Sequence, residues 1–172
     1  MNSIETIIEE YGQKIYKYCY NMLRNRQEAE DAAQDIFIKV YNNMSHMHEI
    51  KSVSSWLYRI AYNQCLNIIR RKKLFFFIPI SDDLKINAAN YDTSTESEFG
   101  EHLTSIISLL PAQDRSVLIL HVIEEKSYDE IAVIFNKKPD AVRKQYERAR
   151  KKVKSYLEIE RGVKTSEKVS IL

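Results

Sequence analysis

Apolar residues recur every three or four positions through two long stretches of the chain, and this spacing predicts helices. In the first stretch, three such runs follow one another within residues 1–73. The third predicted helix spans about Ser54 to Arg71, and Ser54 or Ser55 is placed to cap its start. Because three apolar faces can bury one another, this stretch predicts a helical bundle. Its expected core positions are Ile8, Tyr11, Ile15, Tyr18 and Met22, then Ala29, Ala33, Ile36, Val40 and Met44, then Leu57, Ile60, Ala61, Gln64 and Ile68.

The second stretch, residues 101–157, is divided by signals that start and stop helices. Pro111 suits the first turn of a helix. Ser127 and Glu130 match a capping box, which opens a short second helix. Residues 136–138 then predict a turn, and Pro139 begins a long last helix. Helical spacing places Val117, Leu118, Leu120 and His121 on the first of these helices, and an apolar stripe of Val142, Tyr146, Ala149, Val153 and Leu157 on the last.

The residues between and after these stretches differ in composition. Residues 81–100 are acidic and rich in turn formers, which is typical of a flexible linker. The chain has 3 Gly and 3 Pro in 172 residues, so long segments contain no helix breaker. We therefore predict an all-α fold of two small helical domains, an N-terminal bundle (1–73) and a C-terminal helix-turn-helix domain (101–157). A flexible linker (74–100) joins them, and a frayed tail (158–172) follows.

Composition excludes several functional classes. No run of about 20 apolar residues is present, and the acidic N-terminus lacks a signal pattern, so we expect a cytoplasmic protein. Cys19 and Cys65 are expected to be reduced thiols. His46 and His48 supply only two of the four ligands that a zinc site usually needs, so we predict no metal. Because no phosphate-binding glycine loop or nucleophile–base spacing is evident, we predict no enzyme, no cofactor and no small-molecule substrate.

The last helix concentrates positive charge, although the net charge of the whole chain is only +2. In a helix-turn-helix, the front of the second helix enters the major groove. Arg143, Lys144 and Gln145 stand at that front, where Arg suits guanine and Gln suits adenine. The alternative is an ordinary solvated basic face. Phosphate contacts suit the residues further along, Arg148, Arg150 and Lys151.

Four sequence motifs together match a known family. The second stretch contains LLPAQDRSVLILHVIEEKSYDEIA and AVRKQYERARKKV, and the first contains EAEDAAQDIFIKVYNNM and SSWLYRIAYNQCLNIIRR. With these motifs in this order, the chain resembles the extracytoplasmic-function sigma factors, a group of bacterial transcription initiation factors. The resemblance implies that the N-terminal domain binds core RNA polymerase and opens the promoter −10 element. It also implies that the C-terminal domain binds the −35 element as duplex DNA.

The resemblance assigns roles to residues of the first stretch. Asn63 occupies the position that faces an unstacked −10 base, and an amide can both donate and accept hydrogen bonds there. The other expected −10 residues are Arg59, Arg70 and Arg71, which suit phosphates, and Met47 and His48, which lie in the loop that captures the base. An acidic rim around an apolar residue suits a basic polymerase surface, although it is also typical of a solvated helix face. The residues of this expected polymerase contact are Asp31, Gln34, Asp35 and Ile38.

The chain departs from the family pattern at several positions. The base-capturing loop lacks the usual aromatic residue near Met47 and the usual Arg-Gly pair near His48. Asn136 replaces a glycine, and Asn tolerates the left-handed conformation of a turn. Lys137 stands at a usually buried apolar position, and Asp140 at a usually small one. We expect Asp140 to complement the helix dipole and Lys137 to supply a phosphate contact.

Other interpretations stay open at this point. The hydrophobic run LFFFIPI at residues 74–80 either packs against a domain, or stabilises a closed arrangement or docks an inhibitor. Because sigma factors of this group are typically held by an anti-sigma factor, often membrane-bound, the resemblance also implies that partner. Two further hypotheses are a stand-alone helix-turn-helix transcriptional regulator, which leaves the acidic face unexplained, and a helical adaptor, which leaves the basic helix unexplained.

Overall fold

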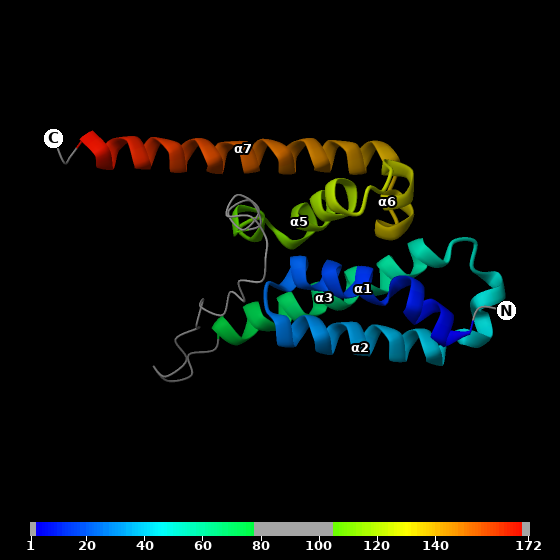
Figure 1. Ribbon diagram of the computed structural model, residues 1–172. Helices are drawn as coiled ribbons and strands as arrows, with labels where there is room; N and C mark the ends of the chain where they lie inside the picture. The colour runs from blue at the N-terminus through cyan, green and yellow to red at the C-terminus, as the bar shows by residue number, and fades with distance from the viewer. Residues whose placement is uncertain (1–2, 78–104, 170–172) are drawn as a thin grey trace. The chain divides into compact units, whose positions relative to one another are not determined.

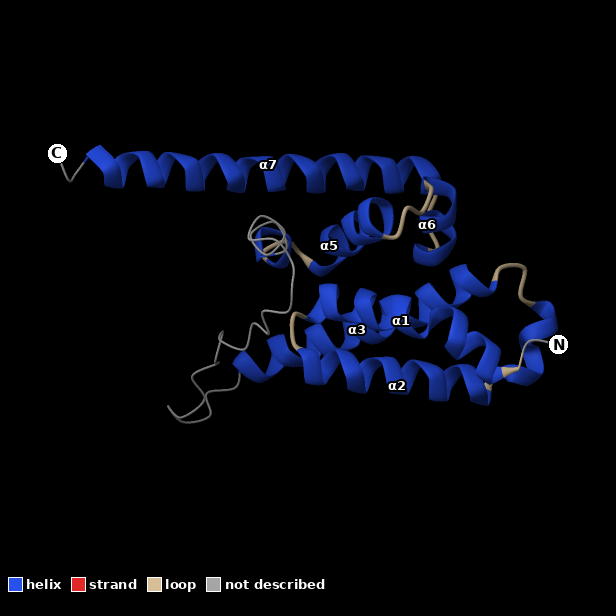
Figure 2. Cartoon of the chain, viewed as in Figure 1, coloured by secondary structure: helices blue, strands red, loops and turns tan. Residues whose placement is uncertain are grey.

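The computed structural model describes residues 3–77 and 105–169, with side chains described for residues 3–74 and 105–159. Within these ranges every regular element is helical, which confirms the all-α prediction (Figures 1 and 2). Beyond residue 77, the predicted linker lies outside the described residues. The elements are α1 (Ile4–Leu23), α2 (Arg26–Asn42), the 3-10 helix η1 (Met44–Glu49), α3 (Val53–Phe77), α5 (Ala112–Leu118), the π-helix η2 (Ile119–Ile123), α6 (Tyr128–Phe135) and α7 (Pro139–Val169).

The described helices form two compact units, in agreement with the predicted pair of helical domains. The first unit contains α1, α2, η1 and α3, and residues 133–136 at the end of α6 are grouped with it. The second is built on α5, η2 and α7, with α6 connecting η2 to α7 along the chain. Each unit has its own buried residues.

In the first unit, α1, α2 and α3 contact one another around one core. Ser3 Oγ accepts a hydrogen bond from the amide of Thr6 at 3.3 Å and so caps α1. Asn25 Oδ1 accepts one from the amide of Glu28 at 2.9 Å and caps α2. Such caps satisfy amides that a helix start would otherwise leave without partners. The core side chains include Ile7, Ile15, Tyr18, Cys19, Met22, Ala29, Ala32, Ile36, Val40, Leu57, Tyr58, Ala61 and Cys65.

The structure corrects the predicted core where two apolar neighbours compete for one position. Ile7 is 2% exposed, whereas the predicted core residue Ile8 is 44% exposed. In the same way Ala32 is buried and the predicted Ala33 only half-buried. Adjacent residues of a helix lie about 100° apart, so choosing the wrong neighbour rotates the predicted face by that angle.

The start and the buried face of α3 also differ from the prediction. The helix is capped by Ser52, whose Oγ accepts a hydrogen bond from the Ser55 amide at 3.2 Å, rather than by Ser54 or Ser55. Leu57 and Ala61 are buried as predicted. The other three predicted core positions of this helix are only half-buried, namely Ile60, Gln64 and Ile68.

In the second unit, Arg115 ties the segment before α5 to that helix. Its guanidinium donates hydrogen bonds to the carbonyl oxygens of Ser108 and Leu110. After α5 the helix widens into the π turn of η2, where the Glu124 amide donates to the Ile119 carbonyl at 3.0 Å. The buried side chains include Ile106, Leu110, Val117, Leu118, Ile119, Leu120, Ile131, Ala132, Val142 and Ala149.

The predicted capping box at the start of α6 is complete. The Glu130 amide donates to Ser127 Oγ at 3.3 Å, and Glu130 Oε2 accepts a hydrogen bond from the Ser127 amide at 2.8 Å. The bonds from Ser127 hold the pKa of Glu130 below its ordinary value. At the other end, Asn136 has the left-handed φ of 53° that the sequence indicated. The Lys137 amide donates to the Ala132 carbonyl at 2.9 Å, which closes the helix end.

Two helices extend past their predicted ends at Arg71 and Leu157. The predicted frayed tail is helical to residue 169, because it contains no proline and is rich in good helix formers. Lys154 and Glu158 also form an ion pair one turn apart, at 3.8 Å. Of the hydrophobic run at residues 74–80, the structure describes only the side chain of Leu74, which is exposed. No helix in the described ranges, the long α7 included, is apolar enough over a sufficient length to cross a bilayer.

We expect Ser127→Ala to destabilise α6 by about 1 kcal/mol, because it removes the hydroxyl that caps the helix. The pKa of Glu130 is lowered by folding, so its contribution should be full above the ordinary carboxyl pKa and be lost as the pH falls through the folded-state pKa. Native-state hydrogen exchange of the α6 amides at neutral and acidic pH measures both effects. Asp129→Asn, at the neighbouring acid, is the control and should change protection less. Equal protection of α6 in Ser127→Ala and in the wild type would contradict this account.

Candidate nucleic-acid interface

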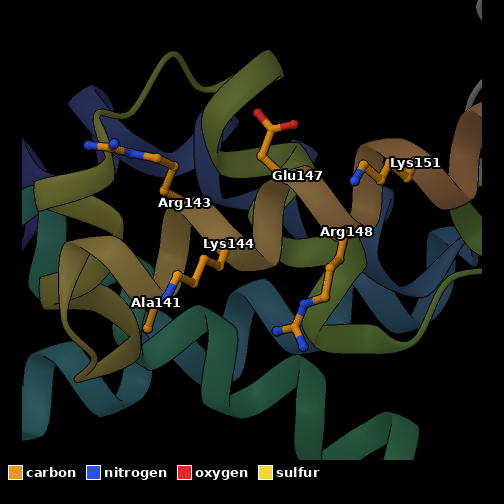
Figure 3. A pocket seen from close by; sticks show the side chains of 6 residues that line it. All are labelled: Ala141, Arg143, Lys144, Glu147, Arg148 and Lys151. Atoms are coloured by element: carbon orange, nitrogen blue, oxygen red, sulfur yellow. The ribbon is translucent and has the colours of Figure 1, made fainter.

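The first half of α7 presents a strongly basic surface (Figure 3). Lys144, Arg148 and Lys151 are spaced so that they share one side of the helix, and all three are exposed. Arg150 is also exposed, and its Nε lies 4.0 Å from a carboxylate oxygen of Glu147. An open hollow of about 510 Å³ lies over this part of the helix. It is lined by Ala141, Arg143, Lys144, Glu147, Arg148 and Lys151.

Arg143, at the front of α7, lies against a small aromatic cluster. Its guanidinium carbon is 6.0 Å from the ring centre of Tyr128, within reach of a cation–π interaction. The Tyr128 ring stacks on His121 at 4.5 Å, and His121 meets Tyr146 edge-on at 4.7 Å. Burial raises the pKa of the Tyr128 hydroxyl, and Tyr146 and Glu147 raise it further. The cluster therefore joins η2, α6 and α7 directly behind the predicted base-reading position.

The structure does not support Gln145 as a base-reading residue. Its side chain is only 3% exposed, on the same face as Val142 and Ala149. These positions are three and four residues apart, which is the spacing of one buried stripe. This spacing is visible in the sequence and indicates burial, whereas the chemistry of the glutamine amide alone suggests adenine contact. Arg143 and Lys144 remain exposed at the helix front.

The amide of Gln145 instead belongs to a hydrogen-bonded network between α5 and α7. Gln145 Oε1 accepts a hydrogen bond from Lys137 Nζ at 2.9 Å, and its Nε2 donates to Asp114 Oδ1 at 3.4 Å. Lys152 Nζ pairs with Asp114 Oδ2 at 2.6 Å. Sequence reasoning missed Asp114 and Lys152 because these partners are far apart along the chain. Lys137 itself is exposed in the turn before α7.

The predicted −10 residues lie on two neighbouring segments of the first unit. Arg59, Asn63 and Arg70 share one face of α3, because they are four and seven residues apart. Asn63, Arg70 and Arg71 are exposed, and Arg59 is half-buried. The loop that the sequence placed after α2 forms the short helix η1, where Met47 is half-buried and His48 exposed. His48 Nε2 lies 3.5 Å from a carboxylate oxygen of Glu49.

The predicted polymerase-binding face of α2 is exposed along its whole length. Asp31, Gln34, Asp35 and Ile38 all point away from the core, and Ile38 is 58% exposed. Tyr41, one turn beyond Ile38, extends this face and is 64% exposed, and it is a residue that sequence reasoning missed. Asp35 Oδ2 accepts a hydrogen bond from Gln64 Nε2 of α3 at 2.9 Å, which holds the carboxylate in place.

The thiols and acidic groups of the described residues form no further site. Cys19 and Cys65 are both free and buried in the first unit. Within the described ranges, no group of three or more His, Cys, Asp or Glu side chains is arranged to hold a metal ion. The candidate surfaces are the exposed faces of α2, α3 and α7 and the η1 segment.

Comparison with protein-family models gives two matches on this chain. Residues 7–75 match the model of sigma-70 region 2, and residues 101–153 match the model of sigma-70 region 4. The first match contains the α2 face, η1 and the −10 candidates. The second contains the helix-turn-helix and the basic part of α7.

Curated relatives match over most of their length. The chain is 32% identical over 162 residues to the ECF RNA polymerase sigma factor SigW of Bacillus subtilis (strain 168), which covers 88% of this chain and 87% of SigW. It is also 32% identical over 157 residues to the RNA polymerase sigma factor YlaC of the same strain, covering 89% of this chain and 91% of YlaC.

Solved structures share the fold. The sigma factor RpoE of Bartonella quintana, determined with the anti-sigma factor NepR, matches with a TM-score of 0.71 and 17% identity over 90% of this chain and 96% of RpoE. CnrH, determined with the cytosolic domain of CnrY, matches with a TM-score of 0.68 and 18% identity over 91% of this chain and 88% of CnrH. At these identities the likeness shows that the fold is common to the three chains.

We expect Tyr128→Leu to destabilise the second unit by about 1 kcal/mol, because leucine cannot stack on His121 or face the Arg143 guanidinium. Tyr128→Phe keeps the ring and should be nearly neutral. Hydrogen exchange of the α7 amides in the two variants measures the difference. If the two substitutions reduce protection equally, the ring contacts do not stabilise this unit.

Proposed function

The chain belongs to the extracytoplasmic-function (ECF) sigma factors of bacterial RNA polymerase, and from this we propose how its surfaces divide the work of promoter recognition. It is a polymerase subunit that binds the core enzyme and directs initiation at specific promoters. The observation that carries the proposal is the presence of sigma-70 regions 2 and 4 on one chain, each with an exposed polar helix face suited to its partner. The working domains are residues 1–73 and 101–157, joined by residues 74–100 and followed by residues 158–172.

In the second unit, α7 is the helix that enters the major groove of the −35 element. Arg143 and Lys144 stand at its exposed front, where long basic side chains reach guanine edges. Tyr128 supports this assignment for Arg143, since contact with the ring restricts the guanidinium before DNA is bound. Phosphates of the duplex are contacted by Lys137, Arg148, Arg150 and Lys151.

In the first unit, α3 and η1 bind the −10 element after its strands separate. Asn63 faces an extruded base, because its exposed amide offers both donors and an acceptor. Met47 and His48 of η1 form the wall of that base site, and the thioether makes it soft and adaptable. The neighbouring arginines bind the strand's phosphates, namely Arg59, Arg70 and Arg71.

The exposed face of α2 binds the core polymerase. Asp31, Gln34 and Asp35 form a polar, acidic rim beside Ile38, and Tyr41 enlarges the apolar part. Such a face suits a basic partner helix, with charge steering the encounter and the apolar residues supplying contact area. The hydrogen bond from Gln64 supports this role, because it fixes the Asp35 carboxylate before binding.

The protein acts in the cytoplasm by binding rather than by catalysis, and it requires no cofactor. We propose that its remaining partner is an anti-sigma factor, often a membrane-bound protein in this group. This partner is supported by the family and by the shared fold with RpoE, which was determined with the anti-sigma factor NepR bound. The hydrophobic run at residues 74–80 is a candidate contact for that partner, and Leu74 is the one residue of the run whose side chain the structure describes.

Mixing the protein with core RNA polymerase and a library of promoter fragments should yield transcripts with selected start sites. The protein alone should bind the same fragments weakly, since its two DNA-binding surfaces lie on separate units. Start-site sequencing and electrophoretic mobility shifts measure the two properties. A protein that shifts DNA strongly without the core, in a salt-dependent manner, would be a stand-alone regulator. One that neither shifts DNA nor confers initiation would be an adaptor.

We expect Ile38→Asp to weaken binding to the core polymerase by at least about ten-fold, because it places a charge at the centre of the proposed contact. The fold should be unaffected, since Ile38 is exposed. The matched control is Ile8→Asp, the same change at an exposed isoleucine of α1, which should leave the affinity unchanged. Fluorescence anisotropy of the labelled protein, titrated with core enzyme, measures both. If both variants lose the same amount of affinity for core polymerase, α2 is not the specific contact.

A further inference from the structure

Gln145 carries a buried amide that none of the proposed DNA contacts uses. Its side chain is 3% exposed, and both ends of the amide have partners, Lys137 on the oxygen and Asp114 on the nitrogen. Leaving a buried amide without partners costs free energy, so the side chain is held in one orientation by the two bonds. The buried glutamine is therefore a fixed point to which the exposed turn before α7 is attached.

The charges around this amide determine what the network can do. Asp114 is only 14% exposed, and Lys152 pairs with it directly at 2.6 Å. The acceptor of Lys137 is instead the uncharged oxygen of Gln145. This bond orients the ammonium without cancelling its charge. The network thus joins Lys152, Asp114 and Gln145 to Lys137, whose backbone lies in the exposed turn before α7.

We propose that Gln145 is a positioning residue, whose buried amide holds the Lys137 ammonium against a phosphate of the −35 duplex. The inference rests on the proposed function. In helix-turn-helix complexes, basic side chains around the start of the recognition helix contact the DNA backbone and fix its register. A lysine that is already oriented loses less conformational entropy when it binds. Asp140, exposed in the first turn of α7, repels phosphate, so a fixed neighbouring cation is needed there.

The test uses holoenzyme assembled from core polymerase and the full chain, with a duplex fragment that this holoenzyme selects from a randomised −35 library. Its affinity is measured across a range of salt concentrations. Lys137→Gln should lower the slope of log affinity against log salt by about 0.9, as expected for one lost phosphate contact. Gln145→Met, which keeps the volume of the side chain but not its hydrogen bonds, should reproduce part of this loss. In the Gln145→Met background, Lys137→Gln should change the salt slope by less than half as much as it does in the wild type.

The matched control is Lys138→Gln, which removes the same charge from the adjacent exposed residue of the turn. Lys138→Gln should change the salt slope equally in the wild type and in Gln145→Met. Additive losses for Lys137→Gln and Gln145→Met would overturn the proposal. A changed −35 sequence preference in Gln145→Met, with an unchanged slope, would also overturn it, because Gln145 would then read a base.

A second measurement covers the case in which Gln145→Met does not fold. The ammonium protons of Lys137 should exchange slowly with water in the wild-type protein. They are followed through the ¹⁵N signal of this group, which is assigned by its loss in Lys137→Arg. An ammonium exchanging as fast as that of Lys138 would overturn the inference. A wild-type holoenzyme that selects no promoter would instead defeat the proposed function itself, so the two failures are distinguishable.

Discussion

Burial of a single apolar face on each helix determines every surface by which this protein acts. In α2 the packing of Ile36 and Val40 turns Asp35 and Ile38 toward the solvent. In α7 the packing of Val142 does the same for the basic residues beside it. Because side chains are attached at fixed angles around a helix, the core and the binding surface cannot be chosen independently. In a sigma factor of this size, the orientation of each of a few helices about its own axis therefore decides which side chains can contact polymerase and DNA.

The same constraint explains how much the sequence predicts. Helix order, the capping box at Ser127 and the left-handed turn at Asn136 depend on residues close together in the chain, so local chemistry was sufficient to identify them. The choice between Ile7 and Ile8 depends on neighbouring helices, and periodicity alone left it open. Gln145 is the instructive case, because its amide suits DNA whereas its spacing from Val142 and Ala149 places it on the buried stripe. The hydrogen-bond partner of that amide, Asp114, is distant in the sequence.

Charge is distributed so that a nearly neutral chain can bind partners of opposite sign. Some charges are used internally, as in the pairs Lys72–Glu28 and Lys152–Asp114, which join helices within each unit. The remaining acidic groups on α2 and basic groups on α7 stay exposed on different units. The net charge of the chain does not reveal that acidic and basic groups lie on different units. Attraction to DNA or to a protein depends on the local electrostatic potential of each surface.

The π turn of η2 has a consequence for how such a domain can diverge. A π turn contains one residue more than an α-helical turn, so the helix absorbs an insertion without breaking. It leaves Val122 and Ile123 exposed just before the segment that leads to α6. Loss of one residue there would restore a regular α-helix and rotate the direction in which the chain leaves it by roughly 100° about the helix axis. Single-residue length changes at this turn thus offer evolution a way to re-aim the DNA-reading helix while its own sequence stays intact.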